Sequence, residues 1–197
     1  FTIEKFLNEN DLDVINNTEL SQQLFFDNPK GVHKGEQTAL QEWIETSSDL
    51  GKHLTQKFKN IEYFNNLVVD GFQVYKAINP YDVHSDYILT DNQEPKSDPN
   101  AHKPAYTVVI PLVDPGTFKT IVFDQSATYN NFSEFKNKNP KLENHVPDNT
   151  WEELCGHCHK EDQQWLTIKT IYNWEKGSLF AFNRELFHSS GNFLEAD

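Results

Sequence analysis

The chain has 197 residues, a length that suits one domain, and its 17 Lys and Arg against 30 Asp and Glu give a net charge of -13. This excess of negative charge repels the phosphate backbone that dominates nucleic-acid affinity, so neither DNA nor RNA is an expected partner. No apolar run approaches the roughly 20 residues that a membrane helix needs, and no signal-peptide pattern is visible. With only two cysteines, close together in sequence, the expectation is a soluble cytoplasmic protein that binds no membrane.

The first 60 residues show mainly helical patterning. Within 35–60 the apolar residues recur at steps of three and four without an intervening proline, at Leu40, Trp43, Ile44, Leu50, Leu54 and Phe58. This spacing predicts an amphipathic helix. A shorter helix is predicted over 11–25, where Asn16 and Asn17 weaken the pattern. Residues 1–60 are therefore expected to form a helical support for the rest of the domain.

After position 61 the pattern changes to short runs rich in Val, Ile, Tyr, Phe and Thr, separated by Asn, Asp, Gly and Pro. The predicted strands are 71–77, 83–89, 106–112, 120–124, 167–174 and 178–187. The polar stretches 90–103 and 126–162 are predicted to be long loops or insertions, of the kind that often forms a substrate lid. The expected fold is mainly β with a helical N-terminal part, in a single domain over residues 1–197.

Three residues of the β-rich part have the types and spacing of metal ligands. His84 and Asp86 lie two positions apart in a predicted strand, so both side chains point to one face and can bind the same ion. His188 follows the predicted strand 178–187, 102 residues after Asp86 (188 minus 86). Two imidazoles and a carboxylate form a facial triad with three open coordination positions, the arrangement of non-haem Fe(II) enzymes. Without His188, an ordinary surface pair is the alternative for the other two.

The segments around these residues follow one another as Tyr-Asp-Val-His-Ser-Asp-Tyr, Ala-Tyr-Thr-Val-Val-Ile-Pro-Leu, Lys-Thr-Ile-Val-Phe-Asp and Trp-Glu-Lys-Gly-Ser-Leu-Phe-Ala-Phe-Asn-Arg-Glu-Leu-Phe-His-Ser-Ser-Gly-Asn-Phe. In that order they resemble the core strands of the 2-oxoglutarate and Fe(II)-dependent oxygenase superfamily, and most of all its small prolyl-hydroxylase-like members of phage and bacterial type. The resemblance covers the range 71–193.

This resemblance implies a double-stranded β-helix, a jelly-roll core like that of the cupins, over residues 61–197. It also implies a dioxygenase whose Fe(II) is held by His84, Asp86 and His188, with 2-oxoglutarate and O2 as co-substrates and succinate and CO2 as products. The primary substrate is unidentified: a peptidyl proline or other side chain, or a small metabolite. One scaffold hosts many chemistries, so the fold does not choose among these.

The residues that would bind 2-oxoglutarate also follow from the resemblance. Family members carry a Lys or Arg soon after the distal histidine, which pairs with the far carboxylate of 2-oxoglutarate. Because the chain ends nine residues after His188, the expectation is either that its final strand is truncated before this cation or that another cation replaces it. Arg184, four residues before His188 and expected on the same strand face, is the candidate, with a structural ion pair as the alternative.

Three further residues are expected to hydrogen-bond the co-substrate by similarity of position. Tyr106 and Thr120 lie on the two middle strands, and Tyr75 precedes the His-x-Asp pair. As plain sequence, all three are ordinary β-forming residues.

A second group of metal-capable side chains lies in Cys155-Gly156-His157-Cys158-His159. The string matches the Cys-x-x-Cys-His pattern of covalent haem attachment, which needs an extracytoplasmic compartment. It would also suit a structural zinc ion held by Cys155 and Cys158, with a further ligand from His157, His102 or His145. Two free thiols in an insertion are the favoured interpretation. Zinc here would stabilise the loop rather than perform the chemistry.

Two other functions stay open on the sequence. One is a cupin-like metal enzyme that uses the same barrel without 2-oxoglutarate, such as a dioxygenase or an isomerase, although those barrels generally use more histidine ligands. The other is a non-catalytic barrel with a degenerate metal site. The complete triad argues against the second.

Overall fold

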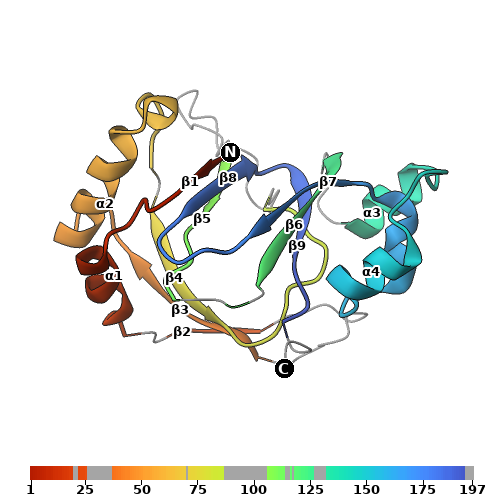
Figure 1. Ribbon diagram of the computed structural model, residues 1–197, viewed down its shortest axis with the longest axis horizontal. Coiled ribbons are helices and arrows are strands. Elements are labelled where there is room, and N and C mark those ends of the chain that lie inside the picture. The colour runs from red at the N-terminus through yellow and green to blue at the C-terminus, as the bar shows by residue number, and fades with distance from the viewer. Residues whose placement is uncertain are drawn as a thin grey trace.

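The structure, a computed structural model, describes residues 1–19, 22–25, 37–69, 71–86, 106–113, 116, 118–126 and 132–193. Its elements in chain order are β1 (Thr2–Ile3), α1 (Glu9–Asn16), β2 (Gln22–Phe25), β3 (Gln37–Ile44), α2 (Asp49–Lys59), η1 (Glu62–Phe64), β4 (Phe72–Ala77), β5 (Tyr106–Val109), β6 (Lys119–Ser126), α3 (Phe132–Lys138), α4 (Asp148–Cys155), η2 (Lys160–Trp165), β7 (Ile168–Asn173), β8 (Leu179–Asn183) and β9 (Leu186–Ser190). In Figure 1 the strands occupy the middle, with α1 and α2 at one end and α3 and α4 at the other. None of the helices in these ranges has the length and apolar character needed to cross a membrane.

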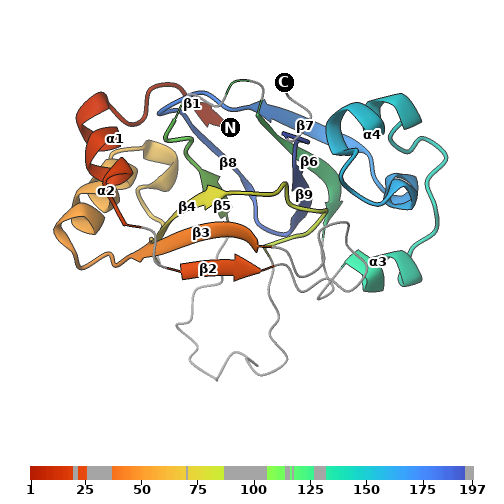
Figure 2. The same cartoon turned by 90° about the horizontal axis from the view of Figure 1, so that it is seen from below.

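The strands of the described ranges form three antiparallel sheets of three strands each. Their orders are β1-β8-β5, β2-β3-β4 and β7-β6-β9. Figure 2, seen from below, shows β2, β3 and β4 side by side along one edge of the molecule. The architecture is thus a mixture of helices and small antiparallel sheets.

Helices α1 and α2 begin at well-formed caps and pack against strands β4 and β8. At the start of α1 the Asn8 side chain accepts from the Asp11 N–H at 3.0 Å, and the Asp11 carboxylate accepts from the Asn8 N–H at 3.0 Å, which satisfies two otherwise unpaired donors. Ser48 caps α2 by accepting from the Gly51 N–H. The apolar faces of both helices pack on strand residues in two clusters, which contain Leu12, Ile15, Leu54, Phe58, Phe72, Val74, Leu179 and Ala181.

A separate apolar cluster joins sheet β1-β8-β5 to sheet β7-β6-β9. Val122 of β6 packs with Phe180 and Phe182 of β8, and all three are at most 5% exposed. His188 lies directly opposite Val122 in the pairing of β6 with β9, so its side chain points to the same side of the sheet. The Phe182 ring lies edge-on to the His188 ring, with 4.8 Å between centroids. This inner side of the two sheets therefore carries one of the candidate metal ligands.

The range 126–162, predicted as a loop, in fact contains helices α3 and α4 and leads into η2. These elements pack on the other face of sheet β7-β6-β9, in a cluster that contains Phe123, Phe132, Phe135, Trp151, Leu154, Leu166 and Phe187. The prediction was wrong because the segment is polar overall and docks through few, widely spaced apolar side chains. On α4 these are Trp151, Leu154 and Cys155, at the three- and four-residue steps of a helix. The predicted insertion 90–103 lies outside the described residues.

The predicted helix over 35–60 is also wrong in its first half. Residues 37–44 form β3, and only Asp49–Lys59 are helical. β3 pairs with β2 on one side and with β4 along Ala39–Ile44 on the other, and these long-range hydrogen bonds outweigh a local pattern that fits a helix. The predicted helix 11–25 ends at Asn16, where its pattern was weak, and 22–25 are strand β2. Residues 1–60 are therefore only partly helical.

Four predicted strands are confirmed within a few residues, as β4, β5, β6 and β7. The predicted strand 178–187 is instead two strands, β8 and β9, which belong to different sheets and are joined by a turn at Arg184 and Glu185. The Asn183 side chain accepts from the Glu185 N–H at 2.8 Å, a local turn contact. Arg184 and His188 are therefore not on one strand face, and that expectation is wrong. Of the predicted strand 83–89 the described part pairs only at His84, and 87–89 lie outside the described residues.

Candidate metal centre

The backbone brings the two histidines of the predicted triad side by side. His84 forms an antiparallel bridge with His188, in which each N–H donates to the other's carbonyl, at 3.0 and 2.8 Å. The two rings lie with their centroids 4.3 Å apart. Asp86 follows His84 by two residues, and its carboxylate reaches both rings. Two segments more than 100 residues apart in sequence thus meet at one place.

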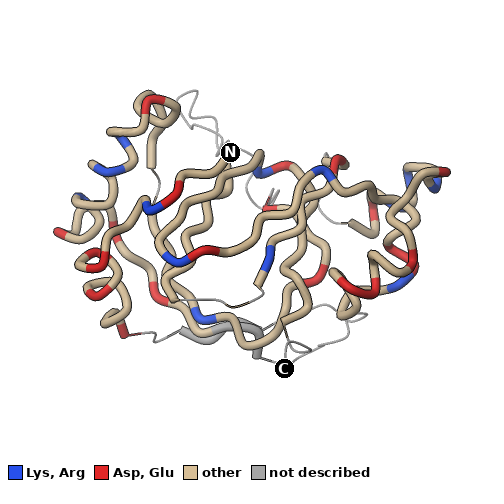
Figure 3. Tube along the Cα trace, viewed as in Figure 1, with Lys and Arg blue, Asp and Glu red and all other residues tan. Residues whose placement is uncertain are grey.

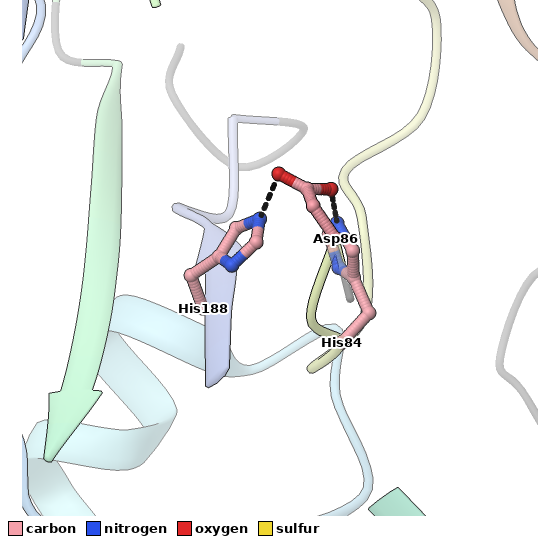
Figure 4. A group of neighbouring side chains, drawn as sticks. All are labelled: His84, Asp86 and His188. Carbon is pink, nitrogen blue, oxygen red and sulfur yellow. Dashed lines mark ion pairs between the residues drawn. The ribbon is translucent and has the colours of Figure 1, made fainter. Parts of the chain in front are cut away.

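The three side chains converge, as Figure 4 shows, with both imidazoles directed at the Asp86 carboxylate. The Nε2 atom of His188 lies 3.6 Å from Oδ2 of Asp86, and that of His84 lies 3.9 Å from Oδ1. One ligand atom from each residue falls within 4.8 Å of the others, and in the described ranges no other group of three His, Cys, Asp or Glu does so. The donor set of two nitrogens and one oxygen is that of a facial triad.

The tautomers of both histidines suit metal binding. The Nδ1–H of His84 donates to the Asp82 carbonyl at 2.7 Å, and that of His188 donates to the Leu186 carbonyl at 3.1 Å. Because a carbonyl only accepts, Nδ1 must carry the proton in each ring. The Nε2 lone pairs are thereby left for an ion. Ligating histidines in metalloproteins commonly make this kind of contact through their other nitrogen.

The charges also match what a metal ion requires. Burial alone would raise the pKa of Asp86, but His188, His84, the Thr107 hydroxyl and Arg184 together hold it below the usual value, so the carboxylate is ionised at neutral pH. Burial, with the nearby His84, lowers the pKa of His188 to about 4 although Asp86 opposes this, so its ring is neutral. An anionic oxygen and a neutral imidazole are the forms that bind divalent cations.

Three neighbours approach Asp86. Thr107 of β5 donates its hydroxyl hydrogen to Oδ2 of Asp86, and the Arg184 Nε–H donates to the Asp86 backbone carbonyl. Burial strongly raises the pKa of Tyr75, and the charges of Tyr81 and Asp86 add to the effect, so the phenol stays protonated. Of the predicted co-substrate residues, Arg184 thus contacts Asp86, and Tyr75 lies near enough for the Asp86 charge to raise its pKa.

The structure does not bring Tyr106 to the triad. Its hydroxyl is 2.7 Å from that of Tyr63, and its ring contacts Tyr63 and Phe64. Neighbouring residues of a strand point to opposite faces, so Tyr106 points away from the side on which Thr107 meets Asp86. Thr107 is the functional residue that was not predicted from the sequence. Because side chains alternate along a strand, knowing which face of β5 points inward would have identified it.

Thr120 lies on the same face of sheet β7-β6-β9 as His188. It is paired with Ser190, two positions along the ladder from the pair of Val122 and His188. Its Oγ1 accepts from the Trp174 indole N–H at 2.9 Å, and the residue is 6% exposed. The structure therefore places Thr120 on the inner side of the sheets, with its hydroxyl already hydrogen-bonded.

The pair Cys155 and Cys158 forms no second metal group within the described residues. Both are free thiols buried among the apolar residues of the α3–η2 segment, with 1% and 5% exposure. Burial raises the pKa of Cys158 well above its usual value, so the thiolate that zinc requires is disfavoured. Of the possible further zinc ligands, His145 bonds the Val146 carbonyl through Nδ1, and His102 lies outside the described residues.

Comparison with protein-family models, curated proteins and solved structures finds no match for this chain.

Proposed function

We propose that this chain is a 2-oxoglutarate- and Fe(II)-dependent dioxygenase that hydroxylates a so far unidentified substrate. The observation that carries the proposal is the convergence of His84, Asp86 and His188, with both histidines held in the tautomer that leaves Nε2 available. Iron is favoured among the metals because two histidines and one carboxylate on one face, with open positions opposite, are the ligand set of non-haem Fe(II) oxygenases. The fold proposed with it is a double-stranded β-helix. It is supported by antiparallel sheets that pack face to face around Val122, Phe180 and Phe182.

In this proposal each nearby residue has a defined task. His84 and His188 each provide a neutral nitrogen, and Asp86 provides the anionic oxygen that balances part of the ion's charge. When bound, the iron would couple the oxidative decarboxylation of 2-oxoglutarate, to succinate and CO2, to hydroxylation of the substrate. Phe182 lies edge-on to His188 and shields it from water. Thr107 fixes the Asp86 carboxylate by donating to the oxygen that lies nearer His188.

Arg184 is the cation that the proposal assigns to the far carboxylate of 2-oxoglutarate. Its Nε–H bonds the Asp86 carbonyl, and its charge helps to lower the Asp86 pKa, so the guanidinium lies beside the metal ligands. Arg forms two-pronged, charge-assisted contacts with carboxylates. The protonated Tyr75 hydroxyl is a second donor near Asp86. A cation and a neutral donor beside the triad favour an acidic co-substrate over the cupin-like alternative that does without one.

The test is succinate formation from 2-oxoglutarate by protein loaded with Fe(II) without oxygen and then exposed to it. Asp86→Ala removes the anionic ligand, and we expect turnover to fall at least about 100-fold. The matched control is Asp124→Ala, which removes an exposed carboxylate that pairs with Lys169 on β7. Similar succinate formation in the wild type and in Asp86→Ala would refute the proposal.

A binding experiment separates the proposal from the cupin-like alternative. Titration of 2-oxoglutarate into the Mn(II)-loaded protein should show binding that Arg184→Met weakens about 10-fold or more, since hydrogen bonds to charged groups are the strong ones. Mn(II) affinity is measured in the same variant. If Arg184→Met lowered the affinity for Mn(II) but not that for 2-oxoglutarate, the role of Arg184 would be to position Asp86 rather than to bind the co-substrate. Metal binding without any 2-oxoglutarate binding would favour the cupin-like enzyme.

A further inference from the structure

The segment that carries His84 is fastened to β9 by side chains as well as by the backbone bridge. The Tyr81 N–H donates to Ser190 Oγ at 2.6 Å, and the Tyr81 carbonyl accepts from Ser189 Oγ at 2.8 Å and from His157 Nε2 at 3.0 Å. We call these contacts the Tyr81 clamp. Tyr81 precedes the ligand His84 by three residues, and Ser189 directly follows the ligand His188. The clamp therefore ties together the two segments whose spacing defines the metal centre.

His157 is the member of the clamp that comes from outside both segments. It follows α4 and is 5% exposed, with Nε2 also 3.2 Å from Ser189 Oγ and 3.3 Å from Cys158 Sγ. Because the Tyr81 carbonyl only accepts, Nε2 must carry a hydrogen. Nδ1 is buried and makes no hydrogen bond among the described residues. Burial lowers the pKa of His157, but Cys158, the Tyr81 carbonyl and Asp82 outweigh it and raise the pKa.

We infer that His157 is a positioning residue of the metal centre. By donating to the Tyr81 carbonyl beside Ser189, it holds the His84 segment against β9 and so sets the distance between the two histidine ligands. The segment that bears α3, α4 and η2 thereby supports the site through His157. The consequence for metal affinity rests on the proposed function, whereas the consequence for the backbone bridge does not.

Two variants of His157 separate this role from simple core packing. His157→Leu fills a similar space and removes the donor, while His157→Gln keeps an N–H donor on a side chain of similar reach. Lys136→Met is the matched control in the same segment. It removes the ammonium group that pairs with the 10%-exposed Asp162 carboxylate, and so it destabilises the docked helices without removing a member of the clamp.

The first measurement is amide hydrogen exchange of the metal-free proteins, read at the two bridge amides of His84 and His188. His157→Leu should speed this exchange about 10-fold, since one hydrogen bond to the clamp is lost and local opening becomes easier. His157→Gln should restore it to within about threefold of the wild type. Lys136→Met should lower the melting temperature and leave the bridge amides within about twofold of the wild type.

The second measurement is Co(II) affinity, followed by the visible absorption of the bound ion. Residues that orient metal ligands are typically worth about 10- to 100-fold in affinity, so His157→Leu should weaken binding by that factor, with recovery in His157→Gln. Equal effects of His157→Leu and Lys136→Met on the bridge amides or on Co(II) affinity, at matched melting temperatures, would overturn the inference. Failure of the wild type to bind Co(II) would refute the proposed function and the metal-affinity consequence, while the exchange data would still decide the clamp.

Discussion

Phe187→Ala is the perturbation that best tests how the segment behind the metal centre is attached. Phe187 has 0% exposure, directly precedes His188 on β9, and meets Phe132 and Phe135 of α3 edge-on at 4.9 and 5.1 Å. A buried aromatic ring removes about 150–250 Å² from water, which at about 25 cal/mol per Å² corresponds to roughly 4–6 kcal/mol as an upper bound. Phe-to-Ala truncations in packed cores cost about 3–5 kcal/mol, and we expect a loss in that range.

The assay is guanidinium unfolding of the metal-free protein followed by tryptophan fluorescence, since Trp151 is 1% exposed and lies in the same apolar cluster as Phe187. Ile171→Ala is the control, because Ile171 lies on β7 of the same sheet but is 38% exposed. It should lose no more than about 1 kcal/mol. If Phe187→Ala lost less than about 1.5 kcal/mol, or no more than the control, α3 would not be packed on β9 as described.

Three further results are expected. Asp11→Ala should lower the free energy of unfolding by about 2 kcal/mol at pH 7, because the 6%-exposed carboxylate caps α1 and pairs with Lys57 at 2.6 Å. Contacts outweigh burial and hold the pKa of Asp11 below its usual value, so this difference in urea unfolding should shrink as acid protonates the folded carboxyl group. Thr107→Val should weaken Co(II) binding about 10-fold, since Asp86 loses a donor and its pKa rises; an unchanged titration would contradict this. The pKa of His188 is about 4 in the folded protein against an ordinary 6.5, so on acidification the unfolded chain takes up the proton first. The stability of the metal-free protein should therefore fall as the pH is lowered from 6.5 to about 4, and His188→Gln should lack that part of the fall.

The candidate metal ligands could be proposed from the sequence because their pattern is local. Two residues at i and i+2 of an extended segment share a face, so His84 and Asp86 needed no knowledge of the rest of the fold. His188 required only that it follow a β-rich run. The structure brings the ligand atoms of all three within 4.8 Å. What the sequence could not supply was the pairing of His84 with His188, which depends on contacts between segments far apart in the chain.

The errors share a physical origin, which is the weight of long-range contacts over local pattern. Residues 37–44 have helical spacing, but hydrogen bonds to strands on both sides make them β3. Arg184 was placed on one strand with His188, but it lies in the turn between β8 and β9, where its Nε–H donates to the Asp86 carbonyl. Tyr106 was proposed by similarity of position, but Thr107, its neighbour on β5, is the residue that contacts Asp86. Strand orientation, not residue type, decides which of the two meets Asp86.

The polar segment 126–162 was predicted to be a long loop or insertion, of the kind that often forms a substrate lid, and its observed position changes where substrate recognition should be sought. Figure 3 shows acidic residues on the helices at both ends of the molecule, and α4 contributes to this surface while its apolar residues are buried against the sheet. This segment supplies His157, whose Nε2–H donates to the Tyr81 carbonyl three residues before His84. The side chains of His84 and Asp86 themselves are 32% and 31% exposed, and Tyr75 lies near Asp86. Under the proposed function the co-substrate would approach through this exposed side, so variants that change substrate preference should be sought around Tyr75 and Arg184 rather than on the docked helices.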